Sequence, residues 1–180
     1  MIRKRINSVV KVGVVGIGGM GKKRVKFLRM NKNVEIVAIC DITEEATKLA
    51  DLYDTSFLVK NYPEFLAIEE MDAVILCVPN NLHFPYSVQA LKAGKHVLVE
   101  YPMALSVEEA EEMTLLTKEK GLVLHPGHTM RFEPEHIAIK NNLDRIGKMI
   151  FVSGYLWYGR NMLKWYGNHK LRGDTFTFLN

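Results

Sequence analysis

The chain has 180 residues, of which 48% are hydrophobic, and it carries a formal net charge of +4. This composition is typical of a globular protein and excludes disordered and fibrous classes, and the 2 cysteines are too few for a disulfide framework. No apolar stretch reaches the roughly 18 uncharged residues of a membrane span, and the basic residues are spread along the chain. We therefore expect a cytoplasmic protein with no membrane partner and no nucleic-acid partner.

Strands alternate with helices along the first part of the chain. Apolar runs that end in turn residues predict strands at 12–15, 34–40, 56–59, 72–78, 95–100 and 122–125. One helix is expected directly after the first strand, and the others at 43–51, 63–68, 83–94 and 106–121. Because these strands are continuously apolar, we expect a parallel sheet covered by helices on both faces, which is a doubly wound α/β fold.

The alternation stops after His125. "PGHTMRFEP" has the composition of a linker, residues 135–145 read as a helix, and residues 148–158 read as a strand. About 55 residues with one helix and one strand cannot bury a core of their own. We therefore place a first domain at 1–125 and the start of a second domain, cut short, at 126–180. The unfinished apolar end predicts a homo-oligomer rather than a lone monomer.

A glycine-rich turn joins the first strand to its helix. Gly16, Gly18 and Gly21 form G-x-G-x-x-G, with Ile17, Gly19 and Met20 between them. The first glycine permits a sharp turn, the second lets the backbone approach a pyrophosphate, and the third lets helix and strand pack closely. The turn with its following helix N-terminus is thus a predicted dinucleotide-phosphate site, and the alternative is a turn without a ligand.

Asp41 ends the second strand about 20 residues after the glycine turn. A carboxylate there accepts hydrogen bonds from the two hydroxyls of an adenosine ribose and repels a 2′-phosphate, so we expect NAD, with NADP as an alternative. Asp41 could also serve only as a helix cap. The basic residues Lys22, Lys23 and Arg24 either face phosphate or form a solvated surface.

The fourth strand ends in "CVPNNLH", beside the point where ligands bind in sheets of this kind. Pro79 stops the strand, Pro79 and Asn80 are expected to contact the cofactor, and His83 either joins them there or packs locally. We expect no metal site, because Pro126 and Gly127 break the helix that would align the neighbouring histidines.

Several motifs in this order and spacing resemble the glucose-fructose oxidoreductase and inositol dehydrogenase (Gfo/Idh/MocA) family: "GVVGIGGMG", "AICD", "DAVILCVPNNLH", "ALKAGKHVLVEYPMALS" and "GHTMRFEP". The resemblance implies a Rossmann domain followed by an α/β domain with a mostly antiparallel sheet, which carries the substrate pocket and often the oligomer interface. It also implies a dehydrogenase that transfers a hydride between a nicotinamide cofactor and a small substrate, commonly a sugar or cyclitol.

The tripeptide Glu100, Tyr101 and Pro102 departs from the family pattern Glu-Lys-Pro. The resemblance places Glu100 at the nicotinamide, makes Tyr101 the catalytic proton donor, and implies a cis peptide before Pro102. A phenol donates a hydrogen bond or a proton, whereas a lysine also stabilises an alkoxide by its charge. "EYPMALS" is similar to biliverdin reductase, so reduction of a conjugated acceptor is one alternative, and a non-catalytic dinucleotide-binding module is another. His128 and Arg131 fall at the hinge and are candidate substrate contacts.

Overall fold

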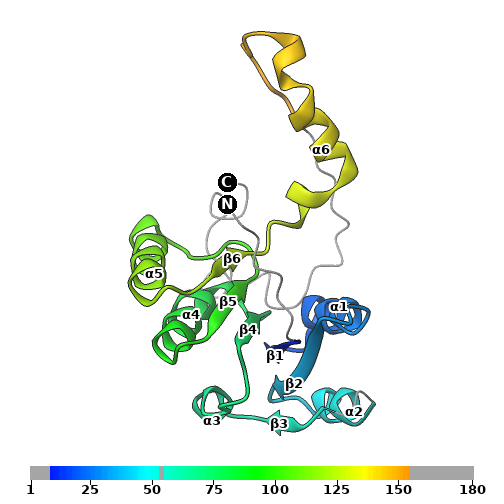
Figure 1. The fold of residues 1–180 in the computed structure, drawn as a ribbon, viewed down its shortest axis with the longest axis vertical. Helices are drawn as coiled ribbons and strands as arrows, with labels where there is room; N and C mark the ends of the chain where they lie inside the picture. The colour runs from blue at the N-terminus through cyan, green and yellow to red at the C-terminus, as the bar shows by residue number, and fades with distance from the viewer. Residues whose placement is uncertain (1–8, 53–54, 155–180) are drawn as a thin grey trace.

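The fold is a single parallel sheet of six strands with helices on both sides (Figure 1). It is seen in a computed structural model that describes residues 9–52 and 55–154. The strands lie in the order β3-β2-β1-β4-β5-β6. Their bounds are Val10–Val15 (β1), Val34–Cys40 (β2), Phe57–Val59 (β3), Ala73–Leu76 (β4), His96–Val99 (β5) and Leu124–Pro126 (β6). The predicted doubly wound fold is confirmed, and the strand order reverses between β1 and β4.

Helices cover the two faces of the sheet in two groups. In Figure 1, α1 and α2 lie on one side of the sheet and α3, α4 and α5 on the other. Their bounds are Gly19–Leu28 (α1), Glu44–Leu52 (α2), Tyr62–Leu66 (α3), His83–Lys92 (α4) and Val107–Lys120 (α5). This separation follows from right-handed crossovers that change sides where the strand order reverses.

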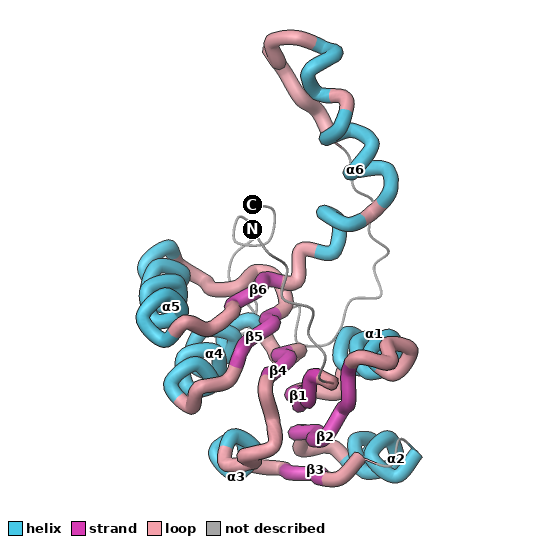
Figure 2. Tube along the Cα trace, viewed as in Figure 1, coloured by secondary structure: helices cyan, strands magenta, loops and turns pink. Residues whose placement is uncertain are grey.

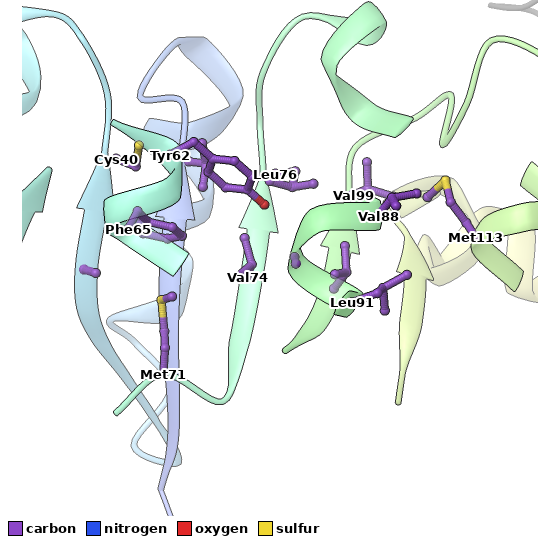
Figure 3. Close-up of a cluster of buried hydrophobic side chains, with 14 of the residues drawn as sticks. Cys40, Tyr62, Phe65, Met71, Val74, Leu76, Val88, Leu91, Val99 and Met113 are labelled. Atoms are coloured by element: carbon purple, nitrogen blue, oxygen red, sulfur yellow. The ribbon is translucent and has the colours of Figure 1, made fainter. Parts of the chain in front are cut away.

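Each face has its own hydrophobic core. Under α3, α4 and α5 the fully buried side chains include Phe65, Leu91 and Met113, which Figure 3 shows packed against the strands. Burying a side chain of this size stabilises the fold by about 2–3 kcal/mol. Gly13 in β1 makes room for Phe65, since a Cβ atom at Gly13 would overlap the aromatic ring. The core under α1 and α2 is smaller and includes the fully buried Val14, Val25 and Ile39.

Capping residues fix the ends of α5 where the sequence predicts them. The Oγ atom of Ser106 accepts a hydrogen bond from the backbone N–H of Glu109 at 3.2 Å, and Glu109 accepts one from the backbone N–H of Leu105 at 2.9 Å. Gly121 ends the helix in the left-handed conformation, with φ 64°. The helix predicted between these residues is therefore confirmed.

The chain leaves the sheet after β6 as an extended arm (Figure 2). The helix predicted at 135–145 is two pieces, α6 (Pro134–Asn141) and the 3-10 helix η3 (Leu143–Ile146), and the expected linker contains the 3-10 helix η2 (Thr129–Phe132). Residues 148–154 form no strand, so this part of the prediction is wrong, while 155–180 lie outside the described residues. The described arm offers no strand for pairing there, and Ile150 remains 94% exposed.

None of the described helices is long and apolar enough to cross a membrane.

Candidate active site

A cavity of about 590 Å³ lies at the carboxyl ends of the central strands, where the strand order reverses. This volume is within the range of small-molecule and cofactor pockets, and the position is the one at which open α/β sheets bind ligands. Of the predicted site residues, eleven line it: Gly16, Ile17, Gly18, Gly19, Met20, Asp41, Pro79, Asn80, His83, Glu100 and Tyr101. The topology therefore gathers four separate sequence motifs into one cavity.

The glycines of the turn have three different environments. Gly16 has a φ of 85°, and a Cβ atom on it would lie 2.5 Å from the carbonyl oxygen of Cys77. A Cβ atom on Gly21 would overlap the carbonyl oxygen of Gly16, so Gly21 serves helix packing and does not line the cavity. A Cβ atom on Gly18 would meet open space. No side chain caps the N-terminus of α1, which leaves its backbone N–H groups available to an anion.

Asp41 both caps the following turn and braces the glycine turn. Its Oδ1 atom accepts hydrogen bonds from the backbone N–H of Thr43 at 2.7 Å and from the Thr43 hydroxyl at 2.6 Å. Its Oδ2 atom accepts the backbone N–H of Ile17 at 2.6 Å. The capping role and the cavity position, which the sequence offered as alternatives, therefore occur together.

His83 ties the loop after β4 to the loop after β5. The residue is 1% exposed, with Nδ1 2.6 Å from the carbonyl oxygen of Pro102 and Nε2 2.9 Å from that of Val78. Burial is the largest influence on the ring and lowers its pKa below the usual value, although both carbonyls and Glu100 favour the charged form. A neutral imidazole has one N–H group, so it donates a hydrogen bond to only one of the two carbonyl oxygens. The other carbonyl oxygen faces the unprotonated ring nitrogen.

A buried ion pair holds Glu100. The Nε atom of Arg24 donates to Glu100 Oε1 at 2.6 Å, and Nη2 lies 2.6 Å from the same oxygen. Arg24 thus has a carboxylate partner and belongs neither to a phosphate site nor to a solvated surface, the two readings that the sequence offered. One feature of the sequence indicated that Arg24 faces inward. It follows Gly21 by three residues, so both residues lie on the same face of the helix.

Gly127 closes over this ion pair and was missed by the sequence analysis. Its backbone N–H donates to the carbonyl oxygen of Val99 at 2.7 Å, so it extends the pairing of β6 with β5. A Cβ atom on Gly127 would lie 2.9 Å from Glu100 Oε2 and 3.0 Å from Arg24 Nη2. Only glycine fits here without displacing the ion pair.

Tyr101 lines the cavity at the start of the loop that follows β5. The peptide bond between Tyr101 and Pro102 is cis, as the family resemblance implied. The ring of His128 lies 6.2 Å from the Tyr101 ring, centroid to centroid. His128 and Arg131 are exposed and are not among the residues that line the cavity, although the ring of His128 lies against that of Tyr101.

Three further lining residues, Lys60, Tyr62 and Tyr86, were not singled out from the sequence. The Tyr62 hydroxyl donates to the carbonyl oxygen of Tyr86 at 2.7 Å, and the two rings stack at 4.0 Å with an interplanar angle of 7°. Lys60 directly follows β3. The signal for Lys60 was its place after a strand, since the carboxyl ends of parallel strands share one edge of the sheet.

The two cysteines near the cavity are free thiols. Burial raises the pKa of Cys40 to about 11, with a smaller contribution from Asp41, and raises that of Cys77 to about 12. Both thiols therefore stay protonated at neutral pH and are poor nucleophiles. Within residues 9–52 and 55–154, no three His, Cys, Asp or Glu side chains gather as metal ligands.

The chain is similar to known proteins in sequence and in fold. Residues 10–128 match the model of the Gfo/Idh/MocA family, described as an oxidoreductase family with an NAD-binding Rossmann fold. The chain is 37% identical over 135 residues to 4-carboxy-2-hydroxymuconate-6-semialdehyde dehydrogenase from Sphingobium sp., covering 74% of this chain and 43% of the relative. It is 30% identical over 152 residues to inositol 2-dehydrogenase/D-chiro-inositol 3-dehydrogenase from Lactiplantibacillus plantarum, covering 80% and 43%.

Among solved structures, biliverdin reductase from Synechocystis sp. in complex with biliverdin and NADP+ superposes with a TM-score of 0.83 at 28% identity, covering 94% of this chain and 54% of that one. The chain thus spans less than half the length of the two curated relatives described above.

Proposed function

The chain belongs to the Gfo/Idh/MocA family of oxidoreductases, whose Rossmann fold binds NAD, and on this premise we propose the reaction that its cavity serves. The proposed activity is hydride transfer between NAD(H) or NADP(H) and a small carbonyl or hydroxyl compound. The observation that carries it is the cavity itself, which has the uncapped N-terminus of α1 and Asp41 at one end and Glu100 with Tyr101 at the other.

The residues present fit a dinucleotide. The N-terminus of α1 and the open space at Gly18 suit a pyrophosphate, and Asp41 suits a hydroxyl of the adenosine ribose. Asn80 is 3% exposed and lines the cavity between the two ends, where we place it as a contact of the nicotinamide half together with Glu100. When bound, the cofactor supplies or accepts the hydride, and the protein supplies position and polarity.

Tyr101 is the residue that we assign to proton transfer. Its phenol would donate a proton to the substrate oxygen during reduction and so become a phenolate, and in the oxidation direction the phenolate would take the proton back. Arg24 neutralises the neighbouring Glu100, which keeps a bare carboxylate away from the developing negative charge on the substrate oxygen.

The substrate class that we favour is a sugar, a cyclitol or a related semialdehyde. The support is the printed activities of the relatives, an inositol dehydrogenase and a semialdehyde dehydrogenase. A second candidate is the reduction of a conjugated acceptor such as a bilin. It is favoured by the likeness to biliverdin reductase and by Tyr101, because a reaction without a substrate alkoxide needs no lysine at this position.

The first test is a pair of fluorescence titrations with NADH and NADPH, followed by turnover assays with inositols, aldoses, a hydroxymuconate semialdehyde and biliverdin. Binding of a cofactor with turnover of one substrate class is expected. Cofactor binding without turnover of any of them would favour a non-catalytic dinucleotide-binding module, and binding of neither cofactor would overturn the proposal.

Tyr101→Phe tests the assigned proton donor on whichever substrate is turned over. We expect kcat to fall about 100-fold, because general acid catalysis is lost, while the Kd for NADH stays within about twofold. An unchanged kcat would show that Tyr101 only packs at the domain junction.

The domain boundary at residue 125, the cytoplasmic location and a homo-oligomer formed through the second domain stay predictions. The exposed apolar side chains of Ile146, Met149, Ile150 and Phe151 on the arm support an interface there. Size-exclusion chromatography with light scattering is the measurement that decides the oligomeric state.

A further inference from the structure

We propose that Lys60 gives the adenosine end of the cavity its tolerance for a 2′-phosphate, so that the protein binds NADPH as well as NADH despite the carboxylate of Asp41. This inference rests on the proposed function and deepens it, because it assigns cofactor selectivity to one pair of residues, Asp41 and Lys60.

Strand pairing sets Lys60 beside Asp41. β3 runs parallel to β2, with Val59 in register with Cys40. Asp41 and Lys60 are therefore the residues that follow this last pair on the two strands. The backbone N–H of Asp41 donates to the carbonyl oxygen of Val59 at 3.1 Å, which holds the two strand ends together. Both residues line the same cavity.

Asp41 is fixed in place by hydrogen bonds on both carboxylate oxygens. It accepts three hydrogen bonds, from the N–H of Ile17 and from the N–H and hydroxyl of Thr43. A carboxylate has about four acceptor positions, so about one remains for a ribose hydroxyl. These bonds hold both oxygens of Asp41, so its side chain cannot readily turn away from a 2′-phosphate. Because the carboxylate repels that phosphate, a neighbouring cation is needed if the phosphate is to bind.

Lys60 is positioned to supply the cation. Of the described residues that line the cavity, it alone carries a permanent positive charge, against the two carboxylates of Asp41 and Glu100. Its side chain is exposed, and within the part of the chain that the structure describes it takes part in no ion pair. Its flexible four-carbon stem lets the ammonium follow either a hydroxyl or a phosphate.

The other basic residues near the glycine turn are less suited to this task. Arg24 is occupied by Glu100. Lys22 and Lys23 stand on α1 and are not among the residues that line the cavity. The geometry therefore points to β3, rather than to α1, as the source of the charge that meets the 2′-phosphate.

The test compares the Kd values of NADH and NADPH for the wild-type chain, Lys60→Gln, Asp41→Asn and the control Lys23→Gln. Lys60→Gln should weaken NADPH binding about five- to tenfold and change NADH binding less than about twofold, because an exposed cation acts mainly on the additional phosphate. Asp41→Asn should shift the preference towards NADPH. The effect of Lys60→Gln should shrink in 0.5 M salt, where exposed charges are screened. Lys23→Gln should affect the two cofactors equally.

The outcomes separate this inference from the function on which it rests. If the wild-type chain binds NADH and Lys60→Gln leaves the ratio of the two Kd values unchanged, the assignment to Lys60 is overturned and the proposed function stands. The same holds if Lys23→Gln, and not Lys60→Gln, selectively weakens NADPH. If the wild-type chain binds neither cofactor, both proposals are overturned.

Isothermal titration with 2′,5′-ADP and 5′-AMP examines the adenosine end alone. Lys60→Gln should weaken 2′,5′-ADP selectively, and equal losses for both nucleotides would contradict the assignment.

Discussion

The two ends of the cavity are stabilised in different ways. At the Asp41 end, the hydrogen bonds join residues 2 and 24 positions apart, within one strand-turn-helix-strand unit. At the Glu100 end, the ion pair between Arg24 and Glu100 spans 76 positions. The Asp41 end therefore depends on backbone geometry close by in sequence, while the Glu100 end depends on the whole sheet having formed. Substitutions at the two ends should show this difference.

The largest effect is expected from Gly21→Ala, which breaks the glycine turn. The added methyl group would overlap the carbonyl oxygen of Gly16, and a backbone atom cannot rotate out of the way as a side chain can. We expect a loss of about 3 kcal/mol in the free energy of unfolding, measured by urea denaturation.

Gly18→Ala is the matched control for this glycine. Its methyl group meets open space, and Gly18 has a φ of −71° that any residue adopts, so stability should stay level or rise by up to about 1 kcal/mol. The Kd for NADH should nevertheless rise, because the methyl group occupies the approach to the pyrophosphate. Similar losses of stability in both variants would contradict the division of roles between these glycines.

The second effect concerns the Glu100 end. Arg24→Met leaves the buried carboxylate of Glu100 without its partner, and we expect a loss of about 2 kcal/mol. This lies below the cost at a fully buried pair because the Arg24 side chain is 22% exposed. The control Lys26→Met alters an exposed cation of the same helix and should change stability by less than about 0.5 kcal/mol.

A double-mutant cycle distinguishes the ion pair between Arg24 and Glu100 from general packing at this position. Adding Glu100→Gln to Arg24→Met should restore part of the lost stability, since the unpaired charge is then gone. Strictly additive losses would show that the two side chains do not stabilise each other.

A smaller effect is expected at the Asp41 end from Tyr62→Phe. The change removes one buried hydroxyl and leaves the carbonyl oxygen of Tyr86 without that donor, while the ring stack is kept. We expect a loss of about 1 kcal/mol in the free energy of unfolding. A loss above about 3 kcal/mol would mean that the hydroxyl contributes more to the free energy of unfolding than the stacked rings do.

The smallest effect near neutral pH comes from His83. Its pKa is lowered in the folded state, so below the usual value of 6.5 the unfolded chain binds a proton more readily than the folded one. Its contribution to stability is therefore complete above about pH 6.5 and declines as the pH falls. The urea midpoint should drop between pH 7.5 and pH 5, and less steeply in His83→Gln. Parallel profiles in the two proteins would assign the pH dependence to groups other than His83.

Residues that act through local geometry were found from the sequence. The glycine turn with Asp41, and the helix between Ser106 and Gly121, each follow from turn chemistry, capping and strand periodicity over a few residues. Residues 148–154, part of the strand predicted at 148–158, are the counterexample, because strand propensity alone does not supply a pairing partner.

Contacts between distant segments could not be derived in the same way. The sequence offered a phosphate contact or a solvated surface for Arg24, whereas the sheet sets it against Glu100. Nothing near Gly127 in sequence indicates that a side chain there would contact that ion pair. Lys60 became a candidate only once β3 was aligned beside β2.

The sequence by itself determined the doubly wound fold, the glycine turn, Asp41 and the unusual Tyr101, because periodicity, backbone freedom and the chemistry of single side chains are written in consecutive residues. Only the tertiary structure decided which charges meet. Pairing of Arg24 with Glu100, burial of His83 between two carbonyls and the place of Lys60 beside Asp41 depend on the order of strands in the sheet. Electrostatic interactions act through space, and distance along the chain carries no information about them.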